Sequence, residues 1–240
     1  MAPATTASCL SEDPESLPRY YFAYGSNLSP TQMIARCPGS VPLGLAHLPH
    51  AWSWLINGRG YANVIHPSYP DSTSLLDGVG IMGFPDGMAA EAKPQGEANR
   101  GDDDTGHGVY GVLYTLSTED EAELDIYEGV PYAYEKVMLP VQLIDPSLHS
   151  HASQPSQYKG VEQAKQENSK VVAPTVLALV YLDFDRVVPD APRTEYIARM
   201  NRAIHEAQLS FGLPVDYVRH VMRKFIPEGD WEGAGIAPED

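Results

Sequence analysis

The order of strand-like and helix-like segments constrains the fold of this chain more than any other feature. Short runs of aromatic and β-branched residues between turn residues predict strands over 19–24, 51–57, 61–66, 78–84, 108–116, 134–144 and 172–184. Helical spacing of apolar residues predicts long helices only over Thr194–Phe211 and 215–225. Strands therefore dominate, and we expect an α+β fold built on a small barrel or strongly curved sheet with a few helices.

Two polar segments without periodicity interrupt this pattern, at 86–107 and 145–171. We expect both to be loops inserted into a single domain that spans 19–227. Residues 1–18 are rich in proline, serine and acids, so they are expected to form a flexible leader, and 228–240 a C-terminal tail. The beginning of the chain has neither a basic start nor an apolar run, so no signal peptide is expected.

The charge of the chain disfavours two classes of partner. Its 240 residues include 32 acidic and 16 basic ones, for a formal net charge of −16. Such a surface repels nucleic-acid phosphates and anionic lipid, and no stretch approaches the roughly 20 apolar residues of a membrane-spanning helix. Only two cysteines occur, Cys9 and Cys37, and neither suggests a structural disulfide. We therefore expect a cytoplasmic protein.

Segment 24–28, Tyr-Gly-Ser-Asn-Leu, joins the first predicted strand to a helix. Ser29 can cap that helix, Pro30 suits its first position, and Gln32 completes the spacing of a capping box. Gly25 can adopt positive φ, and successive backbone N–H groups at such a junction can form a nest for an anion or an oxyanion. The same residues also suit an ordinary strand-to-helix turn, so both interpretations remain open.

A short acidic helix is predicted over 117–128, capped by Ser117 or Thr118 and followed by Gly129. Its first turn contains three acids, Glu119, Asp120 and Glu121. The helix dipole favours negative charge at this end. We interpret the three side chains as capping charge on a solvated surface.

Glu128 differs from these acids because it lies on the apolar face, four residues after Leu124. It is also at the C-terminal end of the helix, where the dipole disfavours an anion. Partial burial, the dipole and nearby carboxylates such as Asp125 would raise its pKa, which suits a group that both takes and returns a proton. The alternative is that Glu128 frays outward into water.

Taken in this order, these elements resemble the γ-glutamylcyclotransferase family. The resemblance rests on Tyr-Phe-Ala-Tyr-Gly-Ser-Asn-Leu at 21–28, Gly-Val-Tyr-Gly-Val-Leu-Tyr at 108–114, Leu-Asp-Ile-Tyr-Glu-Gly at 124–129 and Tyr-Glu-Lys-Val at 134–137. It covers 19–85, 108–144 and, more weakly, 172–227. The two inserted segments depart from compact members of the family.

The resemblance implies a small mixed β-barrel with peripheral helices. It also implies an enzyme that releases 5-oxoproline and a free amine from a small γ-glutamyl substrate, with Glu128 as general acid and base. The substrate-binding residues that it implies are Tyr24, Gly25, Ser26, Asn27 and Leu28, with Tyr134 as a pocket phenol. Segment 57–63 falls where family members build another pocket wall. The substrate's own α-amine attacks the γ-carbonyl in this reaction, so no metal, cofactor or enzyme nucleophile is required.

Several alternatives remain open from the sequence. The chain could be a non-catalytic module that binds γ-glutamyl or amino-acid ligands, or an enzyme that acts on γ-glutamyl-ε-lysine or glutathione. Some fungal relatives act on γ-glutamyl conjugates in sulfur-containing secondary metabolism, and an insertion-bearing chain could be one of these. The sequence determines neither the amine nor the oligomeric state, which could be monomer or homodimer.

Other candidate sites are weaker. Cys37 has no neighbouring histidine or asparagine that would activate it, and Ser26 lacks the Gly-x-Ser-x-Gly frame of a serine nucleophile. Acids 102–104 and His107 could suggest a cation site, but consecutive acids in a chain point in different directions. The histidines do not have the spacing of zinc ligands. Trp52 and Trp54 alternate on a predicted strand and are interpreted as core or pocket wall.

Overall fold

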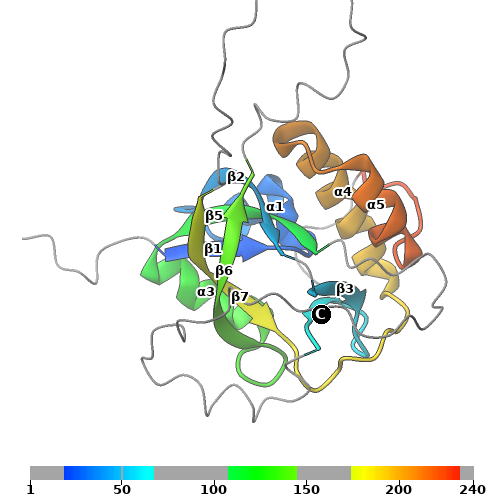
Figure 1. Cartoon of the computed structure of the whole chain (residues 1–240), viewed down its shortest axis with the longest axis horizontal. Helices are drawn as coiled ribbons and strands as arrows, with labels where there is room; N and C mark the ends of the chain where they lie inside the picture. Colours follow the sequence, from blue (N-terminus) through cyan, green and yellow to red (C-terminus); the bar gives the residue numbers. More distant parts are fainter. Residues whose placement is uncertain (1–18, 50, 68–107, 145–173, 233–240) are drawn as a thin grey trace, which may run out of the picture.

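The computed structural model describes residues 19–49, 51–67, 108–144 and 174–232. Within these residues, five strands close into a barrel in the order β1-β5-β2-β6-β7 (Figure 1). Their bounds are Arg19–Ala23 for β1, Val41–Leu48 for β2, Val109–Leu116 for β5, Glu135–Leu143 for β6 and Thr175–Leu182 for β7. Neighbouring strands are antiparallel except β1 and β7, which pair in parallel through Tyr21 and Leu179. The expected α+β fold with a small mixed barrel is confirmed.

A separate two-stranded hairpin is formed by β3 (Ser53–Ile56) and β4 (Ala62–Ile65). Asn57 builds its turn, because its side-chain oxygen accepts hydrogen bonds from the backbone N–H groups of Arg59 (3.0 Å) and Tyr61 (3.2 Å). The hairpin packs on the barrel through Trp54, whose indole N–H donates to the Tyr24 carbonyl at 3.0 Å. The expectation that this tryptophan is a core residue is confirmed.

The helices cover the outside of the barrel. They are η2 (Ser26–Leu28), α1 (Pro30–Arg36), α3 (Thr118–Glu128), α4 (Thr194–Phe211), α5 (Val215–His220) and η4 (Met222–Lys224). Figure 1 shows α4 and α5 together on one side of the barrel and α3 on the other. The turn after β1 runs between these two layers of helix, so groups from both can reach it.

Helix α1 begins as the sequence predicted, with one difference. Ser29 Oγ accepts a hydrogen bond of 3.1 Å from the Gln32 N–H, and Pro30 occupies the first helical position. Gln32 does not return a side-chain bond to complete a capping box. Its amide nitrogen instead donates to Ser26 Oγ (2.8 Å) and Asn27 Oδ1 (2.7 Å), which ties the helix to the turn before it.

Helix α3 is capped by Ser117 Oγ, which accepts from the Asp120 N–H at 3.1 Å, and it ends at Gly129 with φ of 68°. The interpretation of its early acids as solvated surface is wrong for Asp120 and Glu121, which are both buried. The Glu121 carboxylate pairs with Lys136 of β6 at 2.9 Å, and with Arg19 of β1 at 3.0 Å. These ion pairs hold α3 against the barrel.

The core lies inside the barrel and between the barrel and α4. On α4, the predicted apolar stripe of Ile197, Met200, Ile204 and Ala207 is confirmed: Ile197 is partly buried and the other three are fully buried. The last predicted helix, 215–225, is divided into α5 and η4, and its predicted stripe of Val215, Val218, Met222 and Phe225 is only partly correct. Val218 is buried, but Val215 at the start of α5 is 60% exposed.

Several expectations lie outside the described residues. They are the leader 1–18, the strand at 78–84, the insertions 86–107 and 145–171, and the end of the tail from 233. The helices that the structure does describe are all too short or too polar to cross a lipid bilayer.

Candidate active site

The site is organised by the turn between β1 and α1. Gly25 packs closely against α4 and β4: a Cβ atom at this position would lie 2.9 Å from the Tyr196 hydroxyl oxygen and 3.3 Å from Ala62 Cβ. Its φ is −107°, so the expected positive φ is wrong. A glycine is required here because neighbouring atoms leave no room for a side chain.

Two backbone N–H groups of this turn are used inside the protein. Ser26 N–H donates to the Tyr196 hydroxyl at 3.3 Å, and Leu28 N–H donates to the Gly25 carbonyl at 2.9 Å. Two of the N–H groups that were expected to face an anion are therefore used within the protein. Leu28 is fully buried in the core and does not line the cavity described below.

Asn27 connects the turn to the end of α3. Its amide nitrogen donates to Glu128 Oε1 at 3.0 Å and to the Tyr21 hydroxyl at 2.9 Å. Its amide oxygen accepts from Gln32 (2.7 Å) and from Arg36 Nη1 (3.1 Å). Because an arginine can only donate, it fixes the amide orientation and directs the Asn27 NH₂ group at Glu128.

The carboxylate of Glu128 is surrounded by protein, although the residue as a whole is partly exposed at the cavity. Burial raises the pKa of Glu128 above its ordinary value, while Arg36 and the Asn27 hydrogen bond oppose part of that rise. The direction agrees with the expectation from the sequence. Asp125 is not among the main causes of this shift, and its carboxylate accepts from the Tyr181 hydroxyl and Lys136, both at 2.7 Å.

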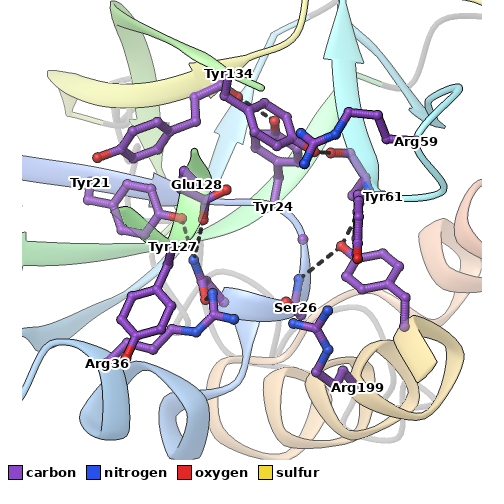
Figure 2. Close-up of a pocket in the computed structure, with 15 residues that line it drawn as sticks. Tyr21, Tyr24, Ser26, Arg36, Arg59, Tyr61, Tyr127, Glu128, Tyr134 and Arg199 are labelled. Carbon is purple, nitrogen blue, oxygen red and sulfur yellow. Dashed lines mark hydrogen bonds between the residues drawn. The ribbon is translucent and has the colours of Figure 1, made fainter. Parts of the chain in front are cut away.

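Glu128 lies on a cavity of about 260 Å³ (Figure 2). Its walls are unusually rich in phenol and guanidinium groups. The lining residues are Tyr21, Tyr24, Gly25, Ser26, Asn27, Arg36, Arg59, Tyr61, Ala62, Tyr127, Glu128, Tyr134, Tyr181, Tyr196 and Arg199. The structure therefore brings together every residue singled out from the sequence except Leu28. The volume suits a ligand of about dipeptide size, near the lower end for small-molecule sites.

The tyrosines of the cavity differ in whether their hydroxyl protons are already donated to a protein acceptor. Tyr134 donates to the Ala62 carbonyl at 2.8 Å, Tyr24 donates to the Tyr181 carbonyl, and Tyr61 donates to Glu195 at 3.0 Å. Tyr134 was expected to act as a pocket phenol. It lines the cavity, but its proton is used by the backbone.

The hydroxyl groups of Tyr196 and Tyr21 instead accept hydrogen bonds from the protein. The Tyr196 hydroxyl accepts from the N–H groups of Ser26 and Ala62, both at 3.3 Å, and the Tyr21 hydroxyl accepts from Asn27. Neither proton has an acceptor among the described residues, so both can be donated into the cavity. Burial raises the pKa of Tyr196 to about 12, so this group remains a neutral donor at physiological pH.

Three arginines carry the positive charge of the cavity. Arg36, at the end of α1, lies with its guanidinium carbon 4.7 Å from the centre of the Tyr127 ring. Arg199 on α4 forms a two-pronged ion pair with Glu195 at 2.9 and 3.2 Å. Arg59 comes from the β3–β4 turn, within segment 57–63, which the sequence had indicated as a further pocket wall.

Sequence reasoning missed Arg36, Arg199, Tyr21 and Tyr196 as lining residues. Arg36 follows Gln32 by four positions and so shares its helical face, which is a signal that could have been used. Tyr196 and Arg199 lie beside the apolar stripe of α4, and no local pattern separates them from core residues.

Two alternative nucleophiles receive no support from the geometry. Cys37 is buried away from the cavity, and burial raises the pKa of its thiol to about 12. Ser26 Oγ accepts from Gln32 and has no basic partner in the part of the chain that the structure describes. Within that same part, no group of three or more His, Cys, Asp or Glu side chains is placed to hold a metal ion.

Comparison with solved structures identifies the fold. A structure described as "Gamma-glutamyl cyclotransferase" superposes with a TM-score of 0.51 and 17% identity, covering 90% of this chain and 91% of that chain. An uncharacterized protein from Homo sapiens gives a TM-score of 0.51 and 16% identity over the same fractions. The chain therefore has the γ-glutamylcyclotransferase-like fold that its motifs had implied. No protein-family model and no curated protein sequence matches it.

Proposed function

We propose that this protein is a γ-glutamylcyclotransferase, which converts a γ-glutamyl conjugate into 5-oxoproline and a free amine. The observation that carries the proposal is the carboxylate of Glu128, which has a raised pKa and is held by Asn27 at the wall of a small polar cavity. The fold shared with a γ-glutamylcyclotransferase structure supports it.

The proposed reaction needs one group that moves protons. Glu128 takes a proton from the α-ammonium group of the substrate, and the freed amine attacks the γ-carbonyl carbon to close a five-membered ring. The ring nitrogen of the tetrahedral intermediate gives up its second proton, the bond to the leaving nitrogen breaks, and protonated Glu128 returns its proton to that nitrogen. The released amine takes up the second proton and departs as an ammonium ion, so the products keep all the N–H protons of the substrate. The carboxylate ends the cycle as it began, so no additional reactant is consumed.

The remaining residues would position charge. Arg36 shares Asn27 with Glu128 and provides a cation for the α-carboxylate, which is attached to the same carbon as the reacting amine. Tyr196 offers a hydroxyl proton that can stabilise the oxyanion formed on the γ-carbonyl. Tyr24, Gly25, Ser26, Asn27 and Tyr134 would shape the part of the cavity that receives the glutamyl group.

The proposal is tested by incubating the full chain with γ-glutamyl-alanine, γ-glutamyl-ethylamine and glutathione and quantifying 5-oxoproline. Wild type should release it from at least one of them. Glu128→Gln should lower kcat by about 10²–10⁴-fold, because the amide cannot carry the proton. Glu123→Gln is the matched control, since Glu123 is an exposed glutamate on the same helix.

Two results would contradict the proposal. Wild type that binds a γ-glutamyl ligand without releasing 5-oxoproline would be a binding module instead. Full activity of Glu128→Gln would exclude this residue as the acid and base.

A further inference from the structure

Among the described residues, the charged groups that face the cavity do not balance one another. Its lining includes three guanidinium groups but one carboxylate, that of Glu128. Arg199 has its own partner, Glu195, just outside the lining. Arg36 contacts Asn27 on the Glu128 side. Among the described residues, no carboxylate pairs with Arg59, so this cation is left for a ligand.

Arg59 is held firmly in place by its backbone. Its N–H donates to Asn57 Oδ1 at 3.0 Å, and its carbonyl accepts from Arg193 Nε at 2.8 Å. The next residue, Gly60, has φ of 86° and is packed against Arg193. The turn therefore presents the Arg59 side chain to the cavity in a defined position.

The guanidinium group of Arg59 lies on an aromatic wall. Its central carbon is 5.5 Å from the centre of the Tyr61 ring and 5.6 Å from that of Tyr134. Its Nη1 atom is buried and has no hydrogen-bond partner among the described residues. Ring faces attract the cation but accept none of its in-plane N–H groups, so the N–H groups of Arg59 that reach the cavity can still bind an oxyanion.

The position of Arg59 assigns it to the leaving half of the substrate. Figure 2 shows Arg59 and Arg36 on opposite sides of the cavity. In the proposed reaction, the α-amine must reach Glu128, so the α-carboxylate on the same carbon also lies on the side of Glu128 and Arg36. The glutamyl half then has no second carboxylate for Arg59.

We propose that Arg59 is a specificity-determining residue that binds an acidic group on the amine released from the substrate. This inference rests on the proposed cyclotransferase function and narrows its substrate class. The preferred substrates are γ-glutamyl amino acids or peptides, whose released amine carries a carboxylate, rather than neutral γ-glutamyl amines. A planar guanidinium group can hold such a carboxylate through two parallel hydrogen bonds.

The test compares γ-glutamyl-alanine with γ-glutamyl-ethylamine, which differ only by the carboxylate on the leaving half. For wild type, kcat/KM should be about 10- to 100-fold higher for γ-glutamyl-alanine, as expected for a charge-assisted contact. Arg59→Met should remove most of this preference by lowering kcat/KM for γ-glutamyl-alanine alone. Arg59→Gln, which keeps a polar side chain without the charge, is a second variant and should behave in the same way. Arg219→Met, at an exposed arginine outside the cavity lining, is the control and should leave both rates unchanged.

The outcomes separate this inference from the proposed function. If wild type forms no 5-oxoproline from either substrate, the proposed function is wrong, and the inference fails with it. If wild type uses both equally well, the cyclotransferase function holds but Arg59 has no such role. An equal loss of kcat/KM on both substrates in Arg59→Met and Arg59→Gln would place Arg59 at the glutamyl half and also overturn the inference.

Discussion

Asn27 donates a hydrogen bond of 3.0 Å to the Glu128 carboxylate, joining a turn and a helix end that are 101 residues apart. The bond sets the orientation of the carboxylate and also opposes part of the rise in pKa that burial causes. A residue that would act as both base and acid is thus positioned and tuned by one amide group. Arg36 and Gln32 hold that amide from its other side.

Asn27→Ala should therefore raise the pKa of Glu128 further, because a hydrogen bond to the charged form is lost. If Glu128 must be ionised to accept the substrate proton, kcat/KM rises as pH rises through this pKa. The variant should shift that acidic limb to higher pH and lower kcat/KM by about 10²-fold through misplacement of the carboxylate. A pH–rate profile on γ-glutamyl-alanine measures both effects.

The matched control for this experiment is Asn201→Ala. Asn201 is also buried and donates to the carbonyls of Ile197 and Pro227, both at 3.0 Å, but it does not line the cavity. Its loss should lower stability without moving the acidic limb. Equal shifts in both variants would show that the effect is structural.

The burial of Glu128 should also make the free energy of unfolding depend on pH. Its raised pKa means that the folded state binds the proton more tightly than the unfolded state does. The stabilisation from the protonated form is fully present below the ordinary pKa of 4.5 and is lost as pH rises through the folded pKa. Above the folded pKa, wild type therefore contains an ionised carboxylate in an unfavourable, buried position.

Glu128→Gln should consequently increase the free energy of unfolding at pH 7 by about 0.5–2 kcal/mol, the usual size of a single stabilising substitution, because it replaces a buried ionisable group by a neutral amide. The gain should disappear below pH 4.5, where Glu128 is protonated in both states. Urea unfolding at pH 4 and pH 7 measures this difference. A variant less stable than wild type at pH 7 would contradict a raised pKa.

Tyr196→Phe should impair both the turn and the chemistry. The N–H groups of Ser26 and Ala62 would lose their acceptor, at a cost of about 1–3 kcal/mol, and the cavity would lose a hydroxyl donor. We expect kcat/KM to fall by about 10²-fold, as for the loss of one oxyanion donor. Thermal unfolding and initial rates on γ-glutamyl-alanine separate the two effects.

Tyr114→Phe is the control for Tyr196. The Tyr114 hydroxyl is buried, lies outside the cavity lining, and has no hydrogen-bond partner in the described part of the chain. Its removal should leave activity unchanged and stability unchanged or slightly higher. If Tyr196→Phe loses stability but keeps the kcat/KM of wild type, its hydroxyl has no role in the reaction.

Two glycines with left-handed backbones should respond differently to alanine. At Gly212, where φ is 70°, an added Cβ atom would meet no other atom within 4 Å, so Gly212→Ala should cost only about 1–2 kcal/mol of backbone strain. A Cβ at Gly60, where φ is 86°, would lie 2.7 Å from Arg193 Cγ and 2.9 Å from its backbone nitrogen. Gly60→Ala should thus cost more than about 3 kcal/mol.

Gly60→Ala should also lower kcat/KM, because the neighbouring Arg59 and Tyr61 both line the cavity. Denaturant unfolding gives the stability difference, and the γ-glutamyl-alanine assay gives the activity. Equal destabilisation of the Gly60 and Gly212 variants would mean that the packing of Arg193 against the turn is unimportant.

Local features of the fold were readable from the sequence because neighbouring residues determine them. Ser29 and Ser117 cap their helices as predicted, and Gly129 and Gly212 end theirs with positive φ. β2 was not among the separate strands predicted. Pro42 and Gly44 weaken its strand pattern, and the register with β5 shifts between them.

The burial of acids on α3 could not be predicted in the same way. Asp120 and Glu121 occupy positions that helix rules assign to a solvated first turn. Their environment depends on Arg19 and Lys136, which arrive from β1 and β6 when the barrel closes. Charge pairing across the barrel thus overrides the local pattern.

The sequence by itself determined the turn after the first strand and the acid at the end of a helix, because each is defined by a few adjacent residues. Only the tertiary structure decided which groups complete the cavity. Tyr196 is 170 residues from Ser26, and they meet because α4 packs on the turn. Whether a phenol proton is free or used by a backbone carbonyl depends on such contacts, which no local pattern records.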